Sequence, residues 1–260
     1  MAKGFTETGT FYFYNEKKQS IPIVFIHGVG LTYEIWQPQL DYFNEYSTLS
    51  YDILGHGKSK LEKEIITFDD FSNQLITLID ELKIDKIHLV GFSIGSLIAR
   101  DFASKHNERL QSLILLGSIF KRTDEQQKIV NERYNQAKKQ MKLSKQALKR
   151  WFTDEYLKKN PNTYEKISTI LSANNMENFL KVYELFVFHK NNENFDKIKV
   201  NTLVMTGEYD IGSTIQMSQE LNRIIKNSEI KIIKNGKHLC GIECADEVNV
   251  SIKNFVEKNV

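Results

Sequence analysis

The feature of this 260-residue sequence that most restricts its fold is the pentapeptide GFSIG at residues 91–95. An apolar run, KIHLV, precedes it and a helical pattern follows it. Glycines on both sides of Ser93 let the backbone take a sparsely allowed conformation and let the following helix pack close to the strand. The stretch predicts a tight strand-to-helix turn that presents Ser93 as a nucleophile. The alternative is a serine that only caps the helix.

Short β-rich runs recur along the chain and alternate with helical patterns. Several of them are continuously apolar, which is typical of parallel strands covered on both faces. The expected strands are 10–14, 21–27, 47–52, 86–91, 110–117, 201–207 and 229–234. Because strands and helices alternate, the sequence predicts an α/β fold with a doubly wound, mostly parallel sheet.

This alternation stops between residues 121 and 198, where only helical patterns occur. The expected helices are 124–142, 145–159, 162–173 and 176–190. Ser144 and Asn175 are candidate N-caps, and Pro161 is expected in a first helical turn.

The interruption divides the chain into two expected parts. Residues 1–120 and 199–260 form the α/β core, and residues 121–198 form a helical cap over the carboxyl edge of the sheet. Its inner side is expected to carry aromatic side chains, for which the candidates are Trp151, Phe152, Phe186 and Phe188. The alternative is a helical bulge with no role in the site.

A serine hydroxyl is a weak nucleophile and needs a base. His238 follows the last expected strand on a short loop, which is where catalytic groups collect in such sheets. Asp210 directly follows the preceding strand and is the candidate that orients the imidazole. The order Ser93, Asp210, His238 is the one expected for a nucleophile on a strand-turn-helix. Glu208 is the alternative acid, and a loop histidine with a structural role is the alternative for His238.

Acyl transfer also needs donors for the oxyanion that develops on the attacked carbonyl. One expected donor is the backbone amide of Ile94, directly after the nucleophile. The other is the amide of Val29 in the HGVG segment at 27–30, with Gly30 as the alternative. His27 is expected to brace this loop.

Composition excludes several other classes of function. The 35 basic and 33 acidic residues leave a net charge of +2, which argues against a nucleic-acid-binding surface. Cys240 and Cys244 are too few for a disulfide framework, and together with His238 too few for a metal site, so inert thiols are expected. The N-terminus has no signal-peptide pattern, and no stretch has the roughly 18 apolar residues of a membrane span. We therefore expect a cytoplasmic protein that binds no membrane.

At these residues the chain resembles the α/β-hydrolase superfamily. The matching features are HGVG, the turn D-x-x-G-x-G-x-S at 52–59, the GFSIG turn, TGEYD and the late His238, in the order of that superfamily. The segments 150–161 and 206–221 look like the branch of 3-oxoadipate enol-lactonases and small carboxylesterases. A serine at position 93 differs from haloalkane dehalogenases and most epoxide hydrolases, which have an aspartate there.

The resemblance implies a serine hydrolase that cleaves small esters or lactones through an acyl-enzyme intermediate, without a metal or organic cofactor. The enol-lactonase branch further implies a substrate that carries a carboxylate. Arg150, beside Trp151, is the candidate cation for that carboxylate; the alternative is an arginine on a solvated helix face. Two alternatives stay open: an acyltransferase or perhydrolase that uses the same three residues, and a small-molecule receptor that retains the hydrolase fold. The oligomeric state is not indicated by the sequence.

Overall fold

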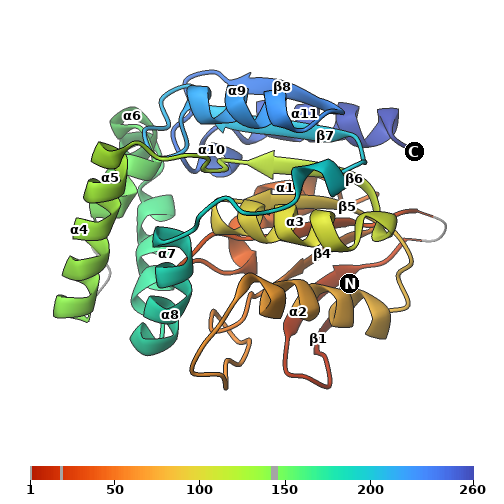
Figure 1. Cartoon of the computed structure of the whole chain (residues 1–260), viewed down its shortest axis with the longest axis horizontal. Coiled ribbons are helices and arrows are strands. Elements are labelled where there is room, and N and C mark those ends of the chain that lie inside the picture. Colours follow the sequence, from red (N-terminus) through yellow and green to blue (C-terminus); the bar gives the residue numbers. More distant parts are fainter. Residues whose placement is uncertain (1, 18–19, 142–145) are drawn as a thin grey trace.

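The computed structural model describes residues 2–17, 20–141 and 146–260. Within these residues, eight strands form one sheet in the order β1-β2-β4-β3-β5-β6-β7-β8 (Figure 1). The strands β1 and β2 are antiparallel to their neighbours, whereas β3 to β8 run parallel. The bounds are β1 (Ala2–Phe5), β2 (Phe11–Asn15), β3 (Ile23–Ile26), β4 (Thr48–Tyr51), β5 (Ile87–Phe92), β6 (Leu110–Leu116), β7 (Thr202–Gly207) and β8 (Ser228–Ile233).

The predicted α/β class and mostly parallel sheet are confirmed. Each of the seven expected strands is present, with ends that differ by at most two residues. The strand β1 was not predicted, because its sequence AKGF has only one large apolar residue and its side chains are mostly exposed. It adds to the edge of the sheet beside β2.

Helices cover both faces of the sheet, as alternate strand residues require. Val24 and Ile26 point into the hydrophobic cluster under one face, and Ile23 and Phe25 point into the cluster under the other. The first face is covered by α2 (Phe68–Glu81), α3 (Ile94–Lys105) and α9 (Ile215–Ile224); the second by α1 (Gln37–Tyr42), α10 (Cys240–Glu243) and α11 (Ala245–Lys258). Period-2 alternation within buried strands thus produces two cores around one sheet.

Between β6 and β7 the chain forms the helices of the expected cap. They are α4 (Asp124–Gln140), α5 (Gln146–Trp151), α6 (Asp154–Lys159), α7 (Pro161–Ser172) and α8 (Met176–Val187). Figure 1 shows them gathered at one end of the sheet, on the left of the view. None of the helices in the described ranges is long and apolar enough to cross a membrane.

The prediction of one cap helix was wrong. The stretch 145–159 is two helices, since the Thr153 hydroxyl accepts a hydrogen bond from the Tyr156 amide and starts a new helix. Asn175 caps α8 by accepting from the Asn178 amide, and Pro161 opens α7, both as predicted. The expected cap Ser144 lies outside the described residues.

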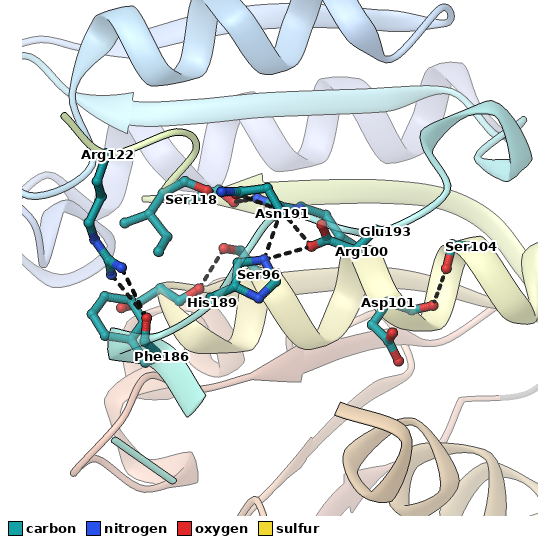
Figure 2. Close-up of polar contacts among 12 residues, drawn as sticks. Ser96, Arg100, Asp101, Ser104, Ser118, Arg122, Phe186, His189, Asn191 and Glu193 are labelled. Carbon is teal, nitrogen blue, oxygen red and sulfur yellow. Dashed lines mark hydrogen bonds and ion pairs between the residues drawn. The ribbon is translucent and has the colours of Figure 1, made fainter. Parts of the chain in front are cut away.

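A buried arginine joins the two ends of the cap to the core. Arg100 of α3 donates to the backbone carbonyl of Ile119, at the start of the cap, over 2.7 Å. Its other terminal nitrogen donates to the carboxylate of Glu193, after the last cap helix. Figure 2 shows this guanidinium between Ser118 and the side chains of His189, Asn191 and Glu193. The chain therefore leaves the core and returns to it beside one guanidinium group.

A second attachment joins the middle of the cap to the loop that carries His238. The Glu243 carboxylate accepts from the amide and hydroxyl of Thr153 in the cap, and from the Lys237 amide in the loop. The Leu239 amide donates to the Trp151 carbonyl over 3.0 Å. Of the two neighbours of His238, Leu239 is thus hydrogen-bonded to the cap itself. Lys237 is hydrogen-bonded to the Glu243 carboxylate, which in turn binds Thr153 of the cap.

Candidate active site

Ser93 lies on a strained turn between β5 and α3. Its backbone has φ 56° and ψ −119°, a conformation that L-residues rarely adopt. A Cβ on Gly91 would lie 2.3 Å from the Gly95 carbonyl oxygen, and one on Gly95 would lie 2.4 Å from the Ile26 carbonyl oxygen. The two glycines are therefore needed so that the turn, the helix and β3 can approach one another, as the sequence indicated.

The structure brings the three residues expected at the site together. The Nε2 atom of His238 lies 3.2 Å from the Ser93 hydroxyl, and its Nδ1 atom lies 2.7 Å from the Asp210 carboxylate. The Asp210 side chain is almost fully buried, while that of His238 is 14% exposed. Phe92 packs against the imidazole, with ring centroids 4.8 Å apart. This hydrogen-bonded chain can take a proton from Ser93 and stabilise the imidazolium that results.

The carboxylate of Asp210 is held by the turn that follows β7. Its Oδ1 atom accepts hydrogen bonds from the amides of Gly212 and Ser213, which leaves Oδ2 for His238. The Ser213 hydroxyl in turn donates to the Gly117 carbonyl at the end of β6. Sequence reasoning missed Ser213; its position three residues after Asp210 in a turn was the available signal. Glu208, the alternative acid, instead accepts from the Asn235 amide.

The HGVG loop is fixed by two buried histidines. His27 Nδ1 donates to the Gly28 carbonyl, while its Nε2 accepts from the Ile53 amide. His56 Nε2 accepts from the Gly30 amide over 2.8 Å. The amide of Gly30, which was the alternative oxyanion donor, therefore already has an acceptor. Neither the Val29 nor the Ile94 amide has a hydrogen-bond acceptor within the described residues.

Both of these histidines are neutral. Burial lowers the pKa of His27 to about 3, helped by the nearby His56, and burial lowers the pKa of His56 to about 4. Neither imidazole therefore carries a charge near pH 7, and each has both ring nitrogens occupied by backbone groups. His27 braces the loop, as expected, and His56, which was not singled out, does the same.

Ser93, Asp210 and His238 open onto a cavity of about 730 Å³ between the core and the cap. Val29, Arg150, Trp151 and Phe186 also line it. Trp151 lies near the imidazole of His238, with ring centroids 6.5 Å apart. The structure thus places the expected substrate-binding residues Arg150 and Trp151 at the same cavity as Ser93.

Two of the four cap aromatics expected at the cavity do not line it. Phe152 is fully buried in the cluster beneath the sheet, where it packs against Tyr156. Phe188 is 50% exposed and contacts Tyr134. Both lie just beyond the ends of their helices, where the direction of the chain changes and helical periodicity no longer predicts the face.

The cysteines near His238 are free thiols. Burial raises the pKa of Cys240 well above its usual value, and burial raises the pKa of Cys244 to about 11. Both are therefore protonated near neutral pH. In the part of the chain that the structure describes, no three histidine, cysteine or acidic side chains gather in a way that suits a metal ion.

Known proteins resemble this chain in sequence and in fold. Residues 21–150 match the model of the family described as alpha/beta hydrolase fold. A curated relative, the (E)-2-((N-methylformamido)methylene)succinate hydrolase of Acinetobacter baylyi, is 28% identical over 94% of this chain and 93% of its own length. The 3-oxoadipate enol-lactonase 2 of the same organism is 23% identical over 91% of this chain and 88% of its own. In fold, the enol-lactonase of Burkholderia xenovorans is similar with a TM-score of 0.83 at 22% identity, covering 98% of this chain and 100% of that one.

Proposed function

Since this chain belongs to the α/β-hydrolase fold family, we propose that it hydrolyses small carboxylic esters or lactones with Ser93, His238 and Asp210 as its catalytic residues. The observation that carries the proposal is the continuous hydrogen-bonded chain from the Ser93 hydroxyl through His238 to Asp210, at the wall of the cavity. Relatives named as a hydrolase and an enol-lactonase support the reaction class.

In the first half of the reaction, His238 Nε2 takes the Ser93 proton while the serine oxygen forms a bond to the substrate carbonyl carbon. The carbonyl π electrons move to its oxygen, and the amides of Val29 and Ile94 donate hydrogen bonds to this oxyanion. When the oxyanion collapses, the ester C–O bond breaks. The imidazolium then gives its proton to the leaving alkoxide or enolate, which leaves an acyl group on Ser93.

In the second half, water takes the place of the leaving group. His238 removes a proton from the water as its oxygen attacks the acyl carbonyl, and the same two amides hold the second oxyanion. Collapse breaks the bond to Ser93, which regains its proton from the imidazolium. Asp210 keeps its negative charge throughout and holds the imidazole with Nδ1 protonated.

For the finer type of enzyme, we propose the enol-lactonase or small carboxylesterase type. Arg150 and Trp151 line the cavity, where a cation and an aromatic wall suit an acyl group that carries a carboxylate. This assignment also agrees with the name of one relative, the 3-oxoadipate enol-lactonase 2 of Acinetobacter baylyi, which is matched over 88% of its own length.

The test is hydrolysis of 4-nitrophenyl butyrate by the wild type and by the Ser93→Ala variant. We expect the variant to lose turnover on the order of 10⁶-fold, since a nucleophile acts as a unit with its base. His238→Ala should cost about as much and Asp210→Asn somewhat less. The matched control is Ser104→Ala, a serine on the same helix that bonds only to the Asp101 carbonyl and does not line the cavity.

A Ser93→Ala variant that kept most of the activity would refute the mechanism. Analysis of the products in the presence of added alcohol or hydrogen peroxide separates hydrolysis from acyl transfer. If the ester or peracid formed faster than the free acid, the acceptor would not be water and the hydrolase assignment would be wrong.

A further inference from the structure

Three guanidinium groups line the cavity that contains Ser93. They belong to Arg122, at the start of the cap, to Arg133 of α4 and to Arg150 of α5. Arg122 already has acceptors, since it donates to the carbonyls of Phe186 and Val187 and stacks on the Phe186 ring (Figure 2). Its role is therefore to fasten the end of α8.

No carbonyl or carboxylate of the described ranges accepts a hydrogen bond from Arg133 or Arg150. Within the described residues, no ion pair includes either side chain. The residues outside the description contain no aspartate or glutamate, so they offer no carboxylate either. Glu132 also lines the cavity, but its side chain is exposed to solvent and forms no ion pair with a described residue.

The two arginines also lie close to each other. Burial lowers the pKa of Arg150, and the positive charge of Arg133 lowers it further. The Tyr183 hydroxyl lies near both: burial raises the pKa of Tyr183, and the charges of Arg133 and Arg150 oppose that rise. Two half-buried like charges thus lie near each other at the cavity, which Tyr183 also lines.

We propose that Arg133 and Arg150 bind two carboxylates on the acyl or lactone part of the substrate, so that this enzyme acts on doubly anionic esters or lactones. The inference rests on the proposed hydrolase function. Its basis is the pair of arginines without carboxylate partners that line the same cavity as Ser93 and His238.

The chemistry of the side chain favours this substrate class. A guanidinium has a fixed fork of donors that matches the two oxygens of a carboxylate, so each arginine is suited to one carboxylate. A single carboxylate would neutralise only one of two neighbouring charges. A cavity of about 730 Å³ lies within the range of small-molecule sites and has room for an acyl group with two carboxylates.

The experiment is a series of 4-nitrophenyl esters whose acyl groups differ in charge: butyrate (neutral), glutarate (one free carboxylate) and propane-1,2,3-tricarboxylate (two free carboxylates). We expect the wild type to prefer the doubly anionic ester. In Arg133→Gln and in Arg150→Gln, the ratio of kcat/KM for the doubly anionic ester to that for the neutral ester should fall about 10- to 100-fold, the range for hydrogen bonds to charged groups. Arg223→Gln, a change at an exposed arginine of α9 away from the cavity, is the matched control and should leave the ratio as it is.

A second measurement does not depend on turnover. Calorimetry with the Ser93→Ala variant should show tighter binding of propane-1,2,3-tricarboxylate than of glutarate, and of glutarate than of butyrate. These free acids carry three, two and one carboxylates, one more in each case than the corresponding ester. Adding Arg133→Gln to this variant should weaken the binding of propane-1,2,3-tricarboxylate more than that of glutarate or butyrate.

The two proposals fail in different ways. If none of the esters is hydrolysed, the proposed function is wrong, and so is a substrate assignment that rests on it. If the esters are hydrolysed but the variants reduce kcat/KM equally for all three, the two-carboxylate inference is overturned while the hydrolase function stands. The same holds if glutarate binds to the Ser93→Ala variant as tightly as propane-1,2,3-tricarboxylate does.

Discussion

Arg100 and the pair Arg133 and Arg150 are arginines in opposite surroundings. Arg100 is completely buried, and the chain itself supplies its carboxylate, Glu193. Arg133 and Arg150 are half-buried at the cavity, where the described residues supply no carboxylate for them. The comparison separates two uses of the same side chain. The Arg100 guanidinium joins the cap to the core, whereas those of Arg133 and Arg150 are the ones proposed to bind a ligand.

The difference follows from the free energy of burying a charge. A guanidinium removed from water needs a partner of opposite charge and acceptors for its remaining N–H groups. Arg100 has a carboxylate, a carbonyl and a serine hydroxyl. Arg133 and Arg150 keep part of their hydration through the open cavity, so they remain charged without a protein carboxylate, and an anionic substrate can replace that water.

The largest expected effect is on stability and concerns the buried pair. Arg100→Met should lower the free energy of unfolding by about 3–5 kcal/mol, because it leaves the Glu193 carboxylate buried without its arginine. Urea unfolding followed by circular dichroism measures this. Arg223→Met, at an exposed arginine, is the control, and the double variant Arg100→Met/Glu193→Leu should recover much of the loss. A loss below about 1 kcal/mol in Arg100→Met would mean that the buried pair does not hold the cap.

The second effect concerns pH. Burial alone would raise the pKa of Glu193, but the hydrogen bond from His189 and the charge of Arg100 lower it from 4.5 to about 2. A lowered pKa means that the folded state favours the charged form. The stabilisation, about 3 kcal/mol by linkage, is therefore complete above pH 4.5 and is lost as the pH falls toward 2. The difference in unfolding free energy between wild type and Glu193→Gln should shrink between pH 6 and pH 3; a constant difference would contradict the assignment.

The smallest expected effect is at the cavity. Arg133→Gln should change the free energy of unfolding by no more than about 0.5 kcal/mol, and in the stabilising direction, since it removes a positive charge that opposes the charge of Arg150. The same urea titration measures it. A decrease of more than about 1 kcal/mol in the free energy of unfolding of this variant would mean that Arg133 has a structural partner. The contrast between Arg133 and Arg100 would then be wrong.

Local sequence patterns predicted most of the fold and the residues that meet at the site. Continuous apolar runs marked the parallel strands, and the two glycines around Ser93 marked the turn because their backbone contacts admit no side chain. Asp210 and His238 could be chosen because groups that follow parallel strands meet at one edge of the sheet. Each of these inferences needed only a few neighbouring residues.

What could not be predicted depends on distant pairings. Nothing local joins Arg100 to Glu193, which lies 93 residues later, and nothing local shows that Arg133 has no carboxylate partner. Arg150 was predicted as the cation of the site because it adjoins Trp151 and because of a family resemblance. Arg133 was not predicted, because it lies in a polar helix with no neighbouring signal. The break at Thr153 was also not predicted. The residues on both sides favour a helix, and the only local signal for a break is one hydroxyl that can cap a new helix.

The attachment of both cap ends at Arg100 has a consequence for how such a protein diverges. The backbone of Ile119 and the side chain of Glu193 bond to one guanidinium, so the chain departs and returns at nearly the same point. The segment between them can therefore change in length while β6 and β7 remain paired neighbours. The exceptions are Trp151 and Thr153, which bond to the loop that carries His238 and to Glu243 and so must keep their place. Under the proposed function, the substrate can then change through the cap arginines while Ser93, Asp210 and His238 keep their geometry.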